Sequence, residues 1–198
     1  MTAVDLSGDV ALIAVSLLTA NLLLGLLLSV GYNPARQWPR QRIKLFPFHN
    51  WTGYVALAAT ALHAAILLFS TAPRFTLFDV LVPIRSPEQP VSNTLGAIGL
   101  YLVAIVVATS LKRSRIALGR HRWKAIHYTT YAAAGVFFIH GLIADPKVQG
   151  SPVDYLDGEK VYIEACALAV LLAVAWRVEH RRAIRRRLQQ PTGNSRSR

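Results

Sequence analysis

The chain has 198 residues, of which 53% are hydrophobic and 16% charged, and its formal net charge is +12. Soluble domains carry about 25% charged residues, so this composition argues against a soluble domain. The basic residues lie in the gaps between apolar runs of about 20 residues, which argues against nucleic-acid binding and indicates helices that cross a bilayer.

Five transmembrane helices are therefore predicted, and the fold class is an all-α, polytopic membrane helix bundle with a single domain over residues 1–198. The last helix is followed by a basic cytoplasmic tail, 179–198. In chain order the five predicted helices cover residues 10–30, 47–69, 94–111, 123–143 and 160–178.

The loops predict the orientation of the bundle. Lys and Arg concentrate after the first, third and fifth predicted helices, whereas the other two loops mix both signs of charge. Because cytoplasmic loops carry the excess of Lys and Arg, the N-terminus is expected outside and the C-terminus inside. The arginine-rich tail then serves to set topology and to contact anionic lipid.

The helix over 10–30 carries no ionisable side chain, but the helices over 47–69 and 123–143 each hold two histidines. His49 and His63 are fourteen residues apart, and His127 and His140 are thirteen apart. These two helices run in the same direction, and fourteen residues rise about 21 Å along a helix axis. The four side chains are therefore expected to form two pairs across the helices, one near each face of the membrane. Ionisable residues inside a span indicate a functional site.

Each pair can supply two axial imidazoles to a haem iron, a ligation suited to electron transfer. Alternatives are hydrogen-bonded packing histidines, a zinc site with only two protein ligands at each level, or a proton relay. A relay more often recruits carboxylates, and Glu164 is the only one well inside a predicted span. The thirteen-residue step leaves its two histidines about 140° apart around a regular helix. That helix is therefore expected to bend, to tilt, or to meet its two ligands from different sides.

The histidine spacing, H-x13-H on one helix and H-x12-H on a later parallel helix, resembles the ferric reductase-like transmembrane domain family. This family includes ferric reductases, NADPH oxidases and the haem-bearing membrane subunit of bacterial methionine sulfoxide reductase systems. The stretches "HNWTGY" and "RWKAIHYTTYAAAGVFFIHG" are also similar to the family. The resemblance covers about residues 45–178, the expected haem-binding core. It implies two b-type haems, ligated by His49 with His127 and by His63 with His140.

Charged and aromatic residues near the pairs give further expectations. The propionates of haem are anionic, so basic neighbours can bind them, although the same charges also set topology. On the cytoplasmic side the candidates are Arg42, Lys44, Arg122 and Lys124, and on the outer side, for the second haem or an anionic substrate, Arg74 and Arg85. The indole rings of Trp123 and Trp176 are expected to anchor the chain at the membrane interface.

The expected function is that of a membrane b-type cytochrome that passes electrons from the cytoplasmic side to an extracytoplasmic acceptor, with ferric iron as one candidate. Larger members of the family continue into flavin and nicotinamide domains. Here about twenty residues follow the last predicted helix, without a G-x-G-x-x-G motif, so the donor is expected to be a separate flavin reductase or a membrane quinol.

Two other readings remain at the level of sequence. One is a quinol-linked haem anchor for an extracytoplasmic oxidoreductase partner, and the other is a haem-free membrane scaffold or transporter. In every case the lipid bilayer, expected to be a bacterial inner membrane, is the surrounding medium.

Overall fold

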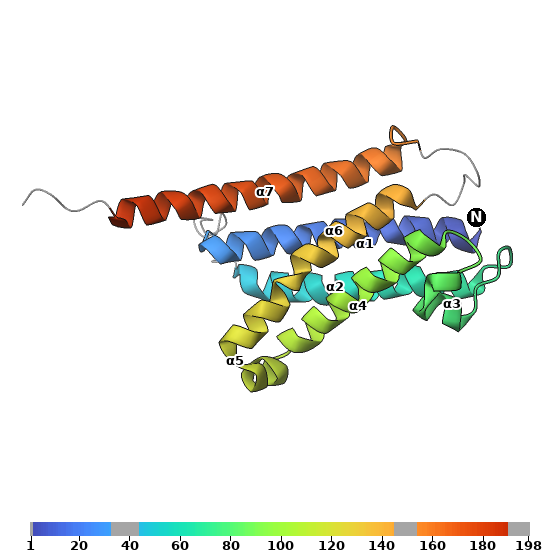
Figure 1. Ribbon diagram of the computed structural model, residues 1–198, viewed down its shortest axis with the longest axis horizontal. Coiled ribbons are helices and arrows are strands. Elements are labelled where there is room, and N and C mark those ends of the chain that lie inside the picture. Colours follow the sequence, from blue (N-terminus) through green and yellow to red (C-terminus); the bar gives the residue numbers. More distant parts are fainter. Residues whose placement is uncertain (1, 33–43, 145–153, 190–198) are drawn as a thin grey trace, which may run out of the picture.

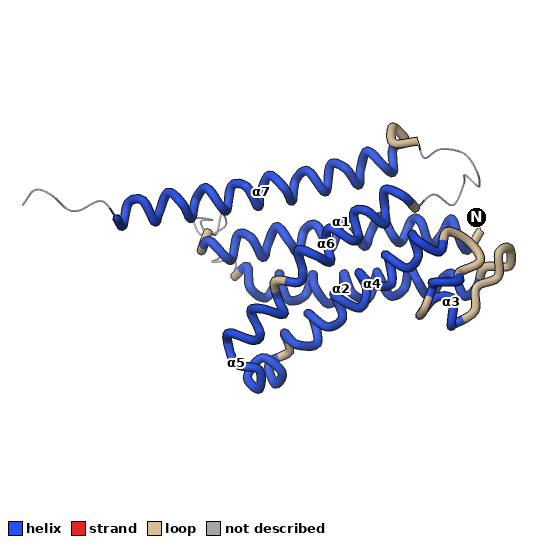
Figure 2. The backbone as a smooth tube through the Cα atoms, in the orientation of Figure 1, coloured by secondary structure: helices blue, strands red, loops and turns tan. Residues whose placement is uncertain are grey.

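The computed structural model describes residues 2–32, 44–144 and 154–189, and all regular structure in these ranges is helical (Figures 1 and 2). The predicted all-α class is confirmed. The α-helices are α1 (Ala3–Val30), α2 (Leu45–Ile66), α3 (Leu77–Leu81), α4 (Pro90–Ser110), α5 (Lys112–His127), α6 (Thr129–Ile143) and α7 (Gly158–Gln189), joined by the 3₁₀ turns η2 (Leu67–Phe69) and η3 (Pro83–Arg85).

Four helices of the described ranges are long and apolar enough to cross a membrane. They are α1, α2 with its following turn η2, α4 and α7. Large apolar side chains on the outside of the bundle fit this, since Leu168, Leu171 and Leu172 of α7 are 57%, 65% and 61% exposed. Exposed apolar surface of this extent is stable against lipid and not against water. The chain is therefore a multi-pass membrane protein.

The helix expected over 123–143 is present but is divided at Tyr128, so that α6 itself has fifteen residues. The hydroxyls of Thr129 and Thr130 donate to the carbonyls of Ile126 and His127, at 2.7 and 2.8 Å. The Tyr131 N–H instead reaches back three residues to the Tyr128 carbonyl at 3.2 Å. Threonine hydroxyls that bond nearby carbonyls compete with the regular helix ladder, and the i→i−3 bond marks a tightened turn.

This turn bears on the thirteen-residue step. A 3₁₀ turn rotates by about 120° per residue instead of about 100°, so tightening reduces the angle between His127 and His140. Helix α6 also runs obliquely across α1 and α2 (Figure 1). The helix predicted over 123–143 was expected to bend, to tilt, or to meet its two ligands from different sides. The structure shows a local break in this helix together with a tilt.

Several helices are longer than expected, because capping residues or polar residues that favour helix continue them beyond the apolar run. Helix α1 begins seven residues early because Thr2 and Asp5 form a capping box, with backbone-to-side-chain bonds of 2.8 and 3.1 Å. Helix α4 begins at Pro90, a residue suited to the first helical turn. Helix α7 continues to Gln189, eleven residues past the expected end, because no Gly or Pro interrupts it. The described part of the predicted basic tail is thus helical.

Two antiparallel helix pairs make up the bundle. Helix α1 packs along α2 and α4 packs along α6, while α7 packs on α1 and α6 (Figure 1). The pairs meet at a small core of Val103, Ala133 and Phe137, against which Leu18 and Leu57 pack. Helices α2 and α6 run in the same direction, as expected. The two histidines of α2 therefore lie at the depths of His127, the last residue of α5, and of His140 on α6.

Candidate functional site

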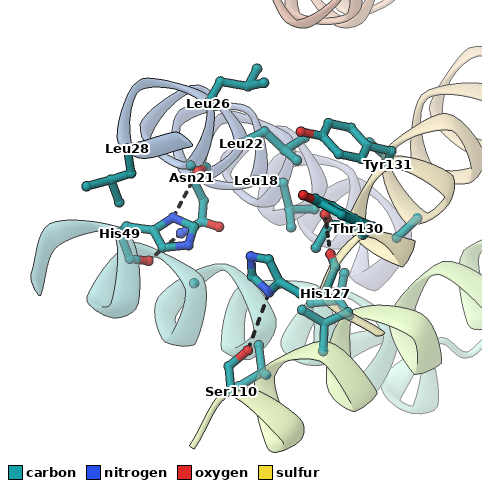
Figure 3. Close-up of a pocket in the computed structure, with 18 of the residues that line it drawn as sticks. Leu18, Asn21, Leu22, Leu26, Leu28, His49, Ser110, His127, Thr130 and Tyr131 are labelled. Carbon is teal, nitrogen blue, oxygen red and sulfur yellow. Dashed lines mark hydrogen bonds between the residues drawn. The ribbon is translucent and has the colours of Figure 1, made fainter. Parts of the chain in front are cut away.

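The four histidines of the spans form the two expected pairs. The ring centroids of His49 and His127 are 6.1 Å apart, and those of His63 and His140 are 6.2 Å apart. In each pair one ring comes from α2 and the other from the stretch that forms the end of α5 and α6. Figure 3 shows the rings of His49 and His127 facing each other across a cavity.

Helix α1 fixes the two rings of α2. The Nδ1 of His63 lies 2.8 Å from the carbonyl oxygen and 2.9 Å from the hydroxyl of Ser7, and that hydroxyl donates to the His63 carbonyl at 2.9 Å. The Nδ1 of His49 lies 3.2 Å from the carbonyl oxygen of Asn21. The Asn21 amide in turn donates to the His49 carbonyl and to the hydroxyl of Thr52.

Helix α4 contacts the rings of His127 and His140 in a similar way. The Nδ1 of His140 lies 2.8 Å from the carbonyl oxygen and 3.1 Å from the hydroxyl of Ser92. The Nδ1 of His127 lies 3.5 Å from the hydroxyl of Ser110, a much longer contact. Ser7 and Ser92 are almost fully buried, being 2% and 4% exposed.

These contacts determine which ring nitrogen can bind a metal. A carbonyl oxygen only accepts hydrogen bonds, so the Nδ1 facing it carries the proton and Nε2 keeps its lone pair. Histidines that ligate metals commonly donate their other N–H to a backbone carbonyl in this way. The structure therefore provides two pairs of imidazoles, in which His49, His63 and His140 keep Nε2 free to bind a metal.

The ring separation fits one metal ion between each pair. Two metal–nitrogen bonds of about 2 Å on opposite sides of an ion, plus the distance from each nitrogen to its ring centre, add up to about 6 Å. Among the described residues no group of three or more His, Cys, Asp or Glu side chains could enclose a metal. Two axial imidazoles suit an ion whose equatorial ligands come from a macrocycle.

A cavity borders each pair. The larger cavity, of about 430 Å³, lies beside His49 and His127, and the smaller cavity, of about 190 Å³, lies beside His63 and His140. Glycines keep space for the rings, because a Cβ on Gly25 would lie 3.2 Å from His49 and one on Gly96 would lie 3.0 Å from His140. Helix α1, which precedes the expected haem-binding core of 45–178, lines both cavities.

Of the charged residues singled out from the sequence, Lys124 lines the larger cavity. Lys44 and Arg122 are exposed and are not among the residues lining it, and Arg42 lies outside the described residues. Arg74 and Arg85 are also exposed, and neither is among the residues lining the smaller cavity. Of the five candidates that the structure describes, it thus brings one, Lys124, to a cavity.

Other basic residues line the cavities instead. Arg115, Arg177 and Arg181 line the larger cavity, and Arg177 donates to the Tyr131 hydroxyl. The Nε of Arg177 is buried and has no hydrogen-bond partner in the described part of the chain. Lys160 lines the smaller cavity and donates to the carbonyls of Gly141, at 2.8 Å, and of Ala144. In the sequence these residues look like ordinary loop and tail charges, so no local signal separates them.

Trp123, which was predicted to anchor the chain at the interface, lines the larger cavity. Its ring stacks on His127 with centroids 5.1 Å apart, and its Nε1 donates to Ser110 at 3.3 Å. This contact arises because Trp123 stands four residues before His127, one helical turn away, where an aromatic ring can cover the imidazole. Asn21 was also missed, although a polar amide in the middle of an apolar span is a signal that could have found it.

Comparison with known proteins agrees with this geometry. Residues 10–138 match the family described as "Ferric reductase like transmembrane component". No curated protein and no solved structure matches the chain significantly. The matched range begins in α1, earlier than the resemblance seen in the sequence, and includes His49, His63 and His127 but ends two residues before His140. Since the match covers well over half of the 198 residues, the chain belongs to the ferric reductase-like transmembrane family.

Proposed function

We propose that this protein is a membrane b-type cytochrome with two haem b groups, one held by His49 and His127 and the other by His63 and His140. The observation that carries the proposal is the repeated pair of facing imidazoles, 6.1 and 6.2 Å apart between ring centroids. Membership of the ferric reductase-like transmembrane family supports membrane electron transfer as the activity.

A haem with both axial positions filled by imidazole supplies one-electron redox chemistry and is suited to electron transfer rather than to binding oxygen. The chain's own residues have the task of holding and orienting the ligands. Ser7, Asn21 and Ser92 keep three of the four Nδ1 atoms against carbonyl oxygens, so that Nε2 stays available.

The basic side chains of the larger cavity have a second task. Arg115, Lys124, Arg177 and Arg181 line it, and none of its described lining residues is a carboxylate. Haem propionates are carboxylates, and Arg binds carboxylates through its planar fork of N–H donors. The buried Nε of Arg177 makes this residue the strongest candidate, in place of the exposed Lys44 and Arg122.

For the topology, we take the stretch from Trp123 to Ile143 as a fifth crossing beside the four apolar helices. The N-terminus then lies outside and the C-terminus inside a bacterial cell membrane, in keeping with the basic residues at the ends of α4, α5 and α7. The His49–His127 pair lies at the cytoplasmic level and the His63–His140 pair at the outer level. Electrons move from a separate flavin reductase or membrane quinol to an extracytoplasmic acceptor, for which ferric iron is one candidate.

The experiment is to measure the haem content and the reduced-minus-oxidised absorbance spectrum of the purified chain. We expect a b-type band and two haems per chain. His63→Ala should lose one of them, whereas His121→Ala, which changes an exposed histidine of α5, should keep both. A colourless protein would contradict the proposal, and an unchanged haem content in His63→Ala would remove His63 as a ligand.

A further inference from the structure

The two histidine pairs differ in how their Nδ1 atoms are held. In the His63–His140 pair, both Nδ1 atoms lie 2.8 Å from a serine carbonyl oxygen. The hydroxyls of the same serines, Ser7 and Ser92, also contact Nδ1 and the backbone carbonyl of the histidine. The same arrangement thus occurs twice, once between α1 and α2 and once between α4 and α6.

The His49–His127 pair is held more loosely. The Nδ1 of His49 is 3.2 Å from its carbonyl partner. The Nδ1 of His127 meets only a hydroxyl, that of Ser110, at 3.5 Å, and Ser110 also accepts from Trp123. A hydrogen bond at this distance is near the limit at which it counts as one. His127 therefore has the least polarised imidazole of the four.

The charges around the two pairs also differ. The larger cavity is lined by four basic side chains and, among its described residues, by no carboxylate. The smaller cavity is lined by one basic residue, Lys160, and by the carboxylates of Asp79, Glu88 and Glu159. Hydrogen bonds from the hydroxyl and then the backbone of Thr76 hold the pKa of Asp79 below its usual value, so this carboxylate is ionised at neutral pH.

Both differences act on a bound redox centre in the same direction. A strong Nδ1–H···O=C bond makes the imidazole a more basic ligand, which stabilises the more positively charged, oxidised metal. Nearby carboxylates also stabilise that state, whereas basic side chains stabilise the reduced one. The reduction potential should therefore be lower at the His63–His140 pair and higher at the His49–His127 pair.

We propose that the two sites are unequal in this sense, and that Ser7 and Ser92 are positioning residues that lower the reduction potential of the site at His63 and His140. The inference rests on the proposed binding of two haems. It adds the order of the two potentials and the residues that set it.

The test is a spectroelectrochemical titration of the purified full-length chain. Two one-electron steps at least 59 mV apart are expected, which corresponds to a tenfold difference in the ratio of oxidised to reduced centres. His63→Ala should leave only the higher-potential step, and His49→Ala only the lower one. Equal steps, or the reverse assignment, would overturn the inference while leaving the two-haem proposal intact. A chain with no haem would contradict the proposed function itself.

Serine variants then test the positioning role. Ser92→Ala keeps the backbone carbonyl that accepts from His140 but removes the hydroxyl that also contacts its Nδ1 and its backbone carbonyl. The ring is then held less firmly against the Ser92 carbonyl, so the lower step should shift to a higher potential, and Ser92→Thr should restore it. Ser110→Ala, the matched change at the other pair, should leave the lower step where it is. An unchanged lower step in both Ser7→Ala and Ser92→Ala, at normal haem content, would overturn the role assigned to the serines.

Discussion

At the scale of single residues, the residues that fix the imidazoles belong to helices that carry none of the four histidines. Ser7 and Asn21 stand on α1, and Ser92 and Ser110 on α4, each against a histidine of a neighbouring helix. Glycines of these two helices complete the arrangement, because Gly25 and Gly96 lie directly against the rings of His49 and His140.

Gly96→Ala should therefore cost the haem at the His63–His140 pair. The added Cβ would lie 3.0 Å from Cε1 and 3.1 Å from Nε2 of His140, so the ring must move away from its ligating position. Haem content measured on the purified variant should fall from two to about one per chain. Gly135→Ala on α6 is the control, since its Cβ would meet nothing within 4 Å. Equal haem content in the two variants would mean that the His140 ring can shift away from the added Cβ and still bind haem.

The sequence reveals the histidines but not the residues that hold them. An ionisable side chain in an apolar span is rare enough to stand out. Serine and glycine, in contrast, are frequent in membrane spans. The serines that contact the His63–His140 pair are also distant in sequence, since Ser92 is 48 residues from His140 and Ser7 is 56 residues from His63. Such pairings depend on how two helices face each other, which no local pattern encodes. The same reason explains why Arg177, at the end of the last predicted helix, did not stand out as a candidate.

At the scale of elements, the turn at Tyr128 allows a thirteen-residue step to serve two pairs. The hydroxyls of Thr129 and Thr130 take up carbonyls that a regular helix would use, and this divides the stretch into the end of α5 and α6. Hydrophobic runs predict where the helices lie, although their ends differ from the expected ones by up to eleven residues. They do not predict this break, because it depends on hydroxyl rotamers rather than on hydropathy.

Inserting one alanine after Gly135 tests the importance of this spacing. The insertion rotates His140 by about 100° and shifts it by about 1.5 Å relative to His127, so one of the two pairs must separate. The insertion variant should bind about one haem per chain. The same alanine inserted after Gly119, at the exposed kink in α5 where φ is 70°, precedes both histidines and should leave two haems bound. Two haems in both variants would show that the spacing between the histidines is not critical.

At the scale of the whole molecule, helix lengths and charges together determine how the bundle sits in a membrane. Helix α7 has 32 residues and is about 48 Å long, well beyond the roughly 30 Å of a bilayer core. Its last turns carry Arg181, Arg182, Arg185, Arg186 and Arg187, all of them exposed. The arginines thus extend the helix beyond the bilayer on the side that we assign to the cytoplasm.

Cysteine labelling checks this orientation. In a Cys166→Ser background, Leu156→Cys places a thiol at a residue that is 87% exposed in the turn before α7, and Arg182→Cys places one near its end. A membrane-impermeant maleimide should label the first variant on intact cells and the second only after permeabilisation. The opposite pattern would reverse the bundle in the membrane and, with it, the direction proposed for electron transfer.

The overall bundle could be predicted because runs of apolar residues and the charges between them are properties of composition. Four helices of membrane-spanning length, the all-α class and the parallel direction of α2 and α6 follow from such runs. The way in which α4 and α1 face the histidine helices could not be predicted, because it depends on the packing of Phe137 against Gly99 and on similar close contacts.

Each histidine pair joins α2, which packs on α1, to the stretch of α5 and α6, which packs on α4. A metal bound between the rings would therefore link these two groups of helices. Its binding free energy would add to the stability of the folded bundle. Assembly of this chain would then be coupled to the supply of the proposed haem. Chains synthesised when haem is scarce would pack less stably and would be cleaved more readily by membrane proteases. The supply of haem would therefore limit the amount of this protein in the membrane.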